Sequence, residues 1–218
     1  LALMAVTSLA TEGVLSGLAR HVPEHCVLAS LQNGIGNEEK IAAAFPANTI
    51  VAASICASLA LTGPGSALWA DDRGGLAAAL HRGDPGRAEQ VWTDLMQRTG
   101  MECAWFSGEK ASPRLKWSKL MLNTGFNALN SVTGKTSAEL LGDDNYGPLA
   151  IAALREGFAI MDCLRLQPFD LPGFAVSKLR LLIKTFPWLS RRIMAWQAGR
   201  SAEAAFSMRQ DVLQNRQH

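Results

Sequence analysis

Three apolar runs in the first 61 residues alternate with helix-like segments. The runs are LALMAV, CVLASLQ and TIVAASICASLAL, and the segments between them are TEGVLSGLARHV and NEEKIAAAF. This alternation is typical of βαβ units with a parallel sheet. After the turn TGPG, the sequence predicts two shorter strands in SALWAD and GLAAALHR, a capped helix in PGRAEQVWTDLMQRTG and a last strand in MECAWFS. Residues 1–110 are therefore predicted to form the second part of a Rossmann-type, doubly wound α/β domain.

From about Ser112 the pattern changes to long helical segments. They include KWSKLMLNTGFNALN, YGPLAIAALREGFAIMDCLRL, a basic and aromatic region at 176–197 and SAEAAFSMRQDVLQNRQ. Residues 111–218 are thus predicted to form a helical domain, so the expected fold class is α/β followed by all-α. The basic and aromatic region resembles a membrane-surface helix, but it is also typical of the outer face of a helical domain, which we favour.

Charge and cysteine usage exclude several function classes. The formal net charge is +2, so neither nucleic acid nor a membrane is expected as a partner. The four cysteines contain no C-x-x-C pair, which favours buried free thiols in a reducing cytoplasm and no metal site. No run approaches the roughly 18 apolar residues of a membrane span, and no basic segment precedes the first apolar run.

The loop LQNGIGNEE joins a predicted strand to a predicted helix. Gly34 and Gly36 would let the backbone approach a ligand at the helix N-terminus, where free N–H groups favour anions. Asn33 precedes these glycines and would reach into the crevice at the carboxyl edge of the sheet. A purely structural turn is the alternative, because Glu39 stands where a dinucleotide fingerprint has its third glycine.

A polar stripe is predicted on the segment 116–130, read as one helix. Lys119, Asn123 and Asn127 stand at i, i+4 and i+8, with Asn130 close to the same face. A snorkelling lysine and locally bonded amides would explain the stripe structurally, whereas a polar substrate would supply partners for all of these groups. In the second case the lysine ammonium would donate a proton to a developing alkoxide. Lys116, one turn earlier, is expected to be a surface lysine.

Four motifs together resemble the ketopantoate reductases, also called 2-dehydropantoate 2-reductases. The motifs are SLQNGIGNEEKI, LTGPG, KWSKLMLNTGFNALNSVTGKTSAELL and SMRQD, in this order. The resemblance implies a cytoplasmic enzyme that uses NADPH to reduce ketopantoate, or a similar 2-keto acid, to pantoate or the matching hydroxy acid. It also implies that 111–218 is the substrate domain.

The same resemblance assigns roles to individual residues. Lys119 matches the catalytic lysine, proposed as the general acid. Asn123, Asn127 and Ser207 match substrate-binding positions, and Asn33 with Gly34 matches the cofactor-binding loop.

Two departures from the family accompany these matches. No G-x-G-x-x-G occurs in the 218 residues, so we expect an incomplete nucleotide-binding domain and poor NADPH binding by this chain alone. Thr7 stands where the family usually has a lysine. Two other functions stay open: a β-hydroxyacid dehydrogenase-like oxidoreductase, and a non-catalytic helical module for binding or dimerisation. A homodimer is also left open, since the sequence does not indicate the oligomeric state.

Overall fold

The computed structural model describes residues 1–57, 59–69 and 74–199 of the 218-residue chain. They form two compact units. The first comprises Leu1–Cys56, Gly74–Leu120 and Leu171–Phe174, and the second comprises the described residues of Ala57–Arg73, Met121–Asp170 and Ala175–His218. Helix α4, Ala111–Thr124, contributes residues to both units.

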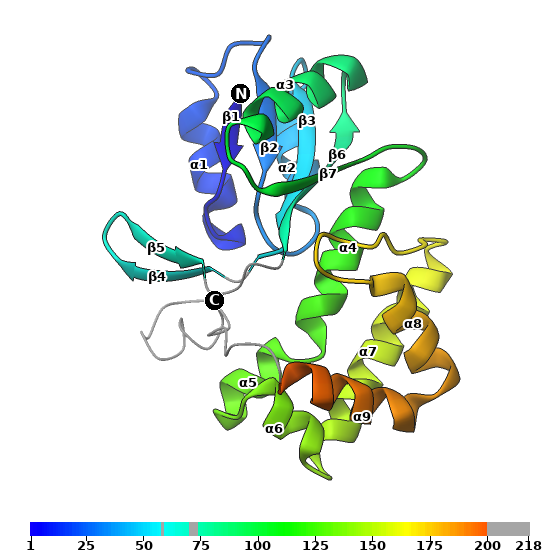
Figure 1. The fold of residues 1–218 in the computed structure, drawn as a ribbon. Helices are drawn as coiled ribbons and strands as arrows, with labels where there is room; N and C mark the ends of the chain where they lie inside the picture. The colour runs from blue at the N-terminus through cyan, green and yellow to red at the C-terminus, as the bar shows by residue number, and fades with distance from the viewer. Residues whose placement is uncertain (58, 70–73, 200–218) are drawn as a thin grey trace. The chain divides into compact units, whose positions relative to one another are not determined.

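A five-stranded sheet forms the centre of the first unit (Figure 1), in the order β1-β2-β3-β6-β7. Its strands are β1 (Ala2–Met4), β2 (Val27–Ser30), β3 (Thr49–Ile55), β6 (Gly75–Arg82) and β7 (Glu102–Phe106). The first three strands are parallel, as the βαβαβ pattern predicts. β6 runs antiparallel to β3, and β7 runs parallel to β6. The predicted fold class is confirmed. The sequence pattern did not predict that β6 runs in the reverse direction.

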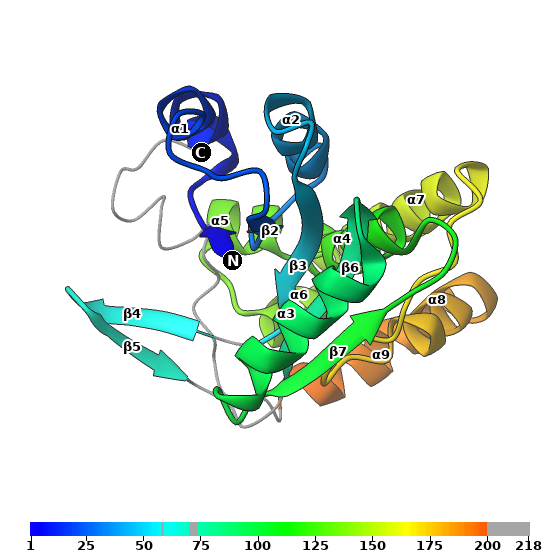
Figure 2. The same cartoon turned by 90° about the horizontal axis from the view of Figure 1, so that it is seen from above.

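Helices cover both faces of this sheet, because alternate side chains of the central strands point to opposite faces. Leu28 and Ile50 pack with α1 (Thr11–Leu18) and α2 (Asn37–Ala44), whereas Val27 and Val51 pack with α3 (Pro85–Gln97). Figure 2 shows α1 and α2 on one side of the strands and α3 on the other. A short 3-10 helix, Ser8–Ala10, precedes α1.

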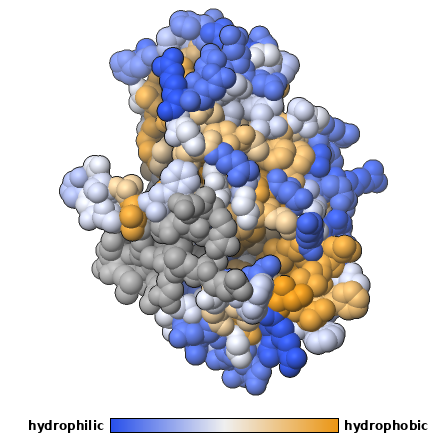
Figure 3. All heavy atoms as spheres, viewed as in Figure 1, coloured by the Kyte–Doolittle hydropathy of each residue, from blue (hydrophilic) through white to orange (hydrophobic). Residues whose placement is uncertain are grey.

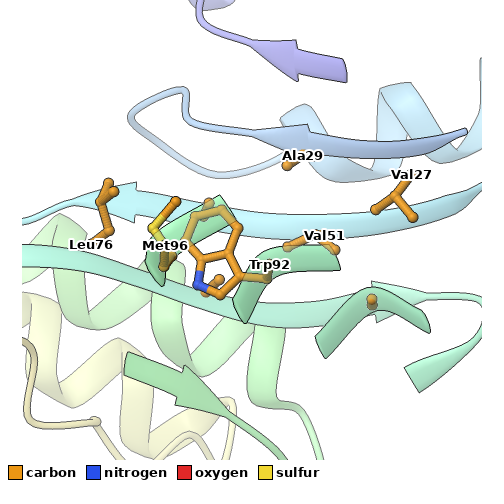
Figure 4. Close-up of a cluster of buried hydrophobic side chains, with 9 residues drawn as sticks. Val27, Ala29, Val51, Leu76, Trp92 and Met96 are labelled. Atoms are coloured by element: carbon orange, nitrogen blue, oxygen red, sulfur yellow. The ribbon is translucent and has the colours of Figure 1, made fainter. Parts of the chain in front are cut away.

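The core under α3 contains the largest side chains of that face. Trp92 and Met96 point from α3 toward the sheet, where Val51 and Leu76 lie (Figure 4). Small alanines complete the cluster on the strands, among them Ala29, Ala53 and Ala78. Close packing of large helix residues on small strand residues explains why this apolar sequence forms a rigid support for its loops.

The third apolar run was predicted as one strand, and this prediction is wrong. β3 ends at Ile55, and a separate strand β4 (Leu59–Gly63) pairs with β5 (Ser66–Trp69) in a hairpin. The predicted turn TGPG lies in this hairpin, with Gly65 at a φ of 70°. β3 stops where its partner begins, since Ile55 pairs with Leu76 at the start of β6.

The second unit is mainly helical, as predicted. Its helices are α5 (Asn127–Thr133), α6 (Ser137–Gly142), α7 (Tyr146–Cys163), α8 (Val176–Thr185) and α9 (Pro187–Ala198). Leu140, Leu154, Phe158 and Ile183 are fully buried among them. Exposed apolar residues also occur on this unit, including Leu181 and Trp188, and Figure 3 shows an apolar patch over α8 and α9. The segment from 201 to 217 that was predicted to be helical lies outside the described residues.

The prediction of one continuous helix over 116–130 is also wrong. α4 ends at Thr124, and α5 begins at Asn127. The break occurs at Gly125, where a Cβ would lie 2.9 Å from Cγ of the buried Leu154. The chain therefore passes closely over α7 at this point, and the polar stripe is divided between two helices.

None of the helices in the described ranges is long and apolar enough to cross a membrane.

Candidate active site

Lys116 is buried in the first unit, which contradicts its predicted place on the surface. Only 3% of its side chain is exposed, and Nζ lies 2.8 Å from Glu38 Oε1 in α2. The ammonium also donates to the carbonyls of Gln32 and Ala53, each at 2.8 Å, and to that of Ser30 at 3.4 Å. Burial lowers the pKa of Lys116, while the Glu38 carboxylate opposes this shift. Lys116 thus joins α4 to α2 and to the carboxyl-terminal parts of β2 and β3.

Lys119 lies three residues further along α4 in different surroundings. Its side chain is partly exposed, and no hydrogen-bond partner of its ammonium is found among the residues that the structure describes. Burial lowers the pKa of Lys119, and the charge of the Cys56 thiolate form acts in the opposite direction. Burial in turn raises the pKa of the Cys56 thiol, so this thiol stays protonated at neutral pH. The Lys119 ammonium thus combines a lowered pKa with the lack of a hydrogen-bond partner in the described ranges.

The loop with Asn33 lies after β2, in the same unit as both lysines. Gly34 and Gly36 have φ values of 86° and 90°, which only glycine adopts without strain, and a Cβ at either position would meet nothing within 4 Å. The Asn33 side chain is exposed. Its backbone carbonyl accepts hydrogen bonds from Ser8 Oγ at 3.2 Å and from Asn37 Nδ2 at 3.1 Å.

A buried polar network joins this loop to the loop after β1. Gln32 Nε2 donates to Thr11 Oγ1 at 2.7 Å and to the Val6 carbonyl at 3.0 Å, while Asn37 Nδ2 donates to Ser8 Oγ at 3.1 Å. Gln32, Thr11 and Asn37 are each less than 5% exposed. Such a satisfied network stabilises one loop conformation, because each broken bond would leave a buried polar group unpaired.

The three asparagines of the predicted stripe have different environments. Asn123 lies in the last turn of α4, and Asn127 is the first residue of α5. The buried Oδ1 atoms of Asn127 and of Asn130 both have no hydrogen-bond partner in the described part of the chain. Asn130 is 1% exposed and donates to the Lys135 carbonyl at 2.7 Å, so it closes the turn after α5.

Other predicted features are only partly described. Ser207 lies outside the described residues. Thr7 is exposed, and its carbonyl accepts a hydrogen bond from the Ala10 amide at 3.0 Å. The four cysteines are free thiols, of which only Cys56 is buried, contrary to the prediction for the whole set. Within the described ranges, no three His, Cys, Asp or Glu residues are grouped as a metal site.

Sequence reasoning missed Lys116, Glu38, Gln32 and Asn37 as members of this region. Glu38 and Asn37 stand in the quoted loop motif, and Lys116 stands in the quoted helix motif. The only hint in the sequence was that these two motifs carry opposite charges, Glu38 in one and Lys116 in the other. No local pattern indicated that the two charges lie in contact.

Comparisons with known proteins agree on one family. The model described as Ketopantoate reductase PanE/ApbA matches residues 1–81, and the model of the carboxyl-terminal part of the same family matches residues 113–218. The comparison with curated proteins gave no significant match.

Solved structures share the fold at low sequence identity. A 2-dehydropantoate 2-reductase from Geobacter metallireducens superposes with a TM-score of 0.74 at 21% identity, and the match covers 99% of this chain and 65% of that one. A 2-dehydropantoate 2-reductase from Methylococcus capsulatus gives 0.73 at 17%, covering 99% and 62%. D-mandelate dehydrogenase with NADH and anilino(oxo)acetate gives 0.74 at 17%, covering 99% and 64%. The chain thus spans less than two thirds of the length of these proteins.

Both halves of the chain match models of one family, and the fold agrees with that of its solved members. The chain belongs to the ketopantoate reductase family.

Proposed function

We propose that the protein reduces a 2-keto acid to the 2-hydroxy acid with a nicotinamide cofactor, and that Lys119 donates the proton. The observation that carries this proposal is the Lys119 ammonium, which is partly buried, has a lowered pKa and has no hydrogen-bond partner in the described ranges. A lysine of this kind is a stronger acid than one in water, and it can protonate the oxygen of a carbonyl that is being reduced.

Asn123 and Asn127 are proposed to bind the substrate. Asn123 follows Lys119 by four residues on the same helix, so the two side chains share one face of α4. The unpartnered Oδ1 of Asn127 would accept a hydrogen bond from a substrate hydroxyl group. Ser207 is proposed as a further substrate-binding residue from the family resemblance alone.

The residues of the Asn33 loop fit the nicotinamide part of a cofactor. Two glycines with positive φ leave open space beside the backbone, and the Asn33 amide is exposed next to them. When bound, the nicotinamide supplies the hydride that adds to the carbonyl carbon. The same loop is less suited to the diphosphate, because the exposed Glu39 lies in the first turn of α2 and repels an anion at that helix end, whereas the Glu38 charge is paired with Lys116.

Ketopantoate with NADPH is the first candidate pair, because the family is named after this substrate and the resemblance implies this cofactor. A second pair, an aryl 2-keto acid with NADH, is favoured by the solved neighbour D-mandelate dehydrogenase, whose structure contains NADH and anilino(oxo)acetate. Both pairs use the same chemistry: hydride addition to the keto carbon and protonation of the oxygen by Lys119.

A substitution at Lys119 tests the proposed chemistry. The longest natural protein that contains these 218 residues is assayed for oxidation of NADPH and NADH with ketopantoate, phenylglyoxylate and other 2-keto acids. Lys119→Ala is expected to lower kcat by about 100- to 10,000-fold with little change in cofactor affinity, because the general acid is lost. Lys178→Ala is the control, since Lys178 is exposed on α8.

Two outcomes would contradict the proposal. If the parent protein reduced none of the keto acids, a non-catalytic binding or dimerisation module would be the better reading. If Lys119→Ala kept kcat within a few-fold of the parent, another group would donate the proton.

A further inference from the structure

The Lys116 ammonium is fully engaged inside the first unit. An ammonium has three N–H donors, and Lys116 has three oxygen neighbours at 2.8 Å: Glu38 Oε1, the Gln32 carbonyl and the Ala53 carbonyl. These contacts belong to three chain segments that meet at the carboxyl-terminal part of the parallel strands. None of the roles proposed above uses this lysine.

Burial of a charged pair needs a reason beyond stability. Two charges lose their hydration on burial, and a well-packed apolar pair in their place is often equally or more stable. Lys116 and Glu38 are each only 3% exposed, so both have lost most of their water. The directional hydrogen bonds to the two carbonyls are what an apolar pair could not reproduce.

Those hydrogen bonds act on the residue that precedes Asn33. The Gln32 carbonyl is held by Lys116, and the Asn33 carbonyl is held by Asn37 and Ser8. Both peptide groups that flank the Cα of Asn33 are therefore held in place, while the Asn33 side chain is exposed. The clamp thus determines where the Asn33 amide and the adjacent Gly34 backbone lie.

We propose that Lys116 is a positioning residue that fixes the Asn33 loop for cofactor binding and holds it at a constant place relative to Lys119. The effect of Lys116 on cofactor binding rests on the proposed function, whereas its effect on the loop conformation does not. Lys116 and Lys119 are three residues apart on α4, so the helix that carries the acid also carries the clamp. Lys116 itself touches neither substrate nor cofactor in this role.

The test separates positioning from folding with a paired substitution. Lys116→Met alone leaves the Glu38 carboxylate buried without its partner and is expected to destabilise the fold. The double variant Lys116→Met/Glu38→Leu removes both charges and is expected to fold, but it still leaves the Gln32 carbonyl without its donor. A third variant, Glu38→Leu alone, removes the carboxylate but keeps Lys116, the donor to the Gln32 carbonyl.

The first readout is NMR relaxation of the backbone amides in the 218-residue chain, which needs no activity. In the double variant, the order parameters at 33–36 are expected to fall from the value of about 0.85 of a rigid backbone to below about 0.6, whereas those of Val27–Ser30 in β2 stay as in the parent. Unchanged order parameters at 33–36 in a folded double variant would overturn the proposal, even if the protein proved to be an active reductase.

The second readout is kinetic, in the longest natural protein that contains the chain. The double variant is expected to raise KM for the cofactor by about 10- to 100-fold, with KM for the keto acid nearly unchanged. In an Asn33→Ala background the same substitutions should raise KM for the cofactor much less, because the side chain that they position is already absent. An equal rise of KM in both backgrounds would overturn the positioning role, whereas an inactive parent would contradict only the proposed function.

Discussion

Lys116 and Lys119 show how the surroundings of one side chain decide its chemistry. Both ammonium groups have a pKa lowered by burial. The Glu38 carboxylate opposes the lowering of the Lys116 pKa, and the Lys116 ammonium donates to backbone carbonyls. Lys119 has no such partner in the described ranges, which is why we propose Lys119 and not Lys116 as the proton donor.

The lowered pKa of Lys119 predicts a pH dependence of the reduction. A general acid works only when protonated, so kcat/KM for the keto acid is expected to fall as the pH rises through this pKa, at a pH below about 10.4, the ordinary lysine value. The measurement is a pH profile at saturating cofactor. Lys119→Ala should lack this alkaline limb, and the Lys178→Ala control should keep it.

A profile that stays flat up to the ordinary lysine pKa would contradict the assignment, as would an unchanged limb in Lys119→Ala.

The stability of the fold depends on pH in the opposite direction from the reduction. The folded protein disfavours the protonated form of Lys119, so the contribution of this residue to the free energy of unfolding rises with pH between the lowered pKa and the ordinary lysine value.

At the scale of elements, the break between α4 and α5 is a feature of packing. Gly125 has no room for a side chain, since its Cβ would lie 2.9 Å from Cγ and 3.0 Å from Cδ1 of Leu154, which is fully buried in α7. Gly125→Ala is expected to lower the free energy of unfolding by about 1 to 3 kcal/mol, because the core has to shift around the added methyl group.

Urea denaturation checks this prediction, with Gly142→Ala as the matched control. Gly142 ends α6 in the same unit, and a Cβ there would meet nothing within 4 Å, so its substitution should not lower stability and should raise it by up to about 1 kcal/mol. If both variants had the same denaturation midpoint, the close approach at Gly125 would not be what interrupts the helix.

For the whole molecule, the 218 residues are expected to bind a nicotinamide dinucleotide weakly. They contain no G-x-G-x-x-G, and the glycine loop that they do contain leads into a helix whose first turn is acidic. Most of the contacts that hold a diphosphate are thus missing from this chain. Calorimetric titration with NADPH and with NADH tests this, and micromolar binding by the 218-residue chain would contradict it.

Local patterns were enough to predict most elements of the fold. Apolar runs bounded by helical segments predicted β1, β2 and the helices between the parallel strands, and the change of pattern after Ser112 predicted the helices that follow. The reversal of β6 was not predicted, because strand direction depends on the pairing of Ile55 with Leu76 across a hairpin. The helix break was not predicted either, since the close approach of Gly125 to Leu154 at this point is a long-range contact.

The sequence by itself determined the class of fold, the glycine loop around Asn33 and a helix with two lysines near a pair of asparagines. Only the tertiary structure decided which lysine forms an ion pair and hydrogen bonds inside the protein and which has no partner in the described ranges. The acceptors of Lys116 lie 63 to 86 residues away along the chain, whereas a helical period relates only neighbours within a few turns. Burial and charge pairing arise from such long-range contacts, and they separate the chemistry of two residues that local sequence makes nearly equivalent.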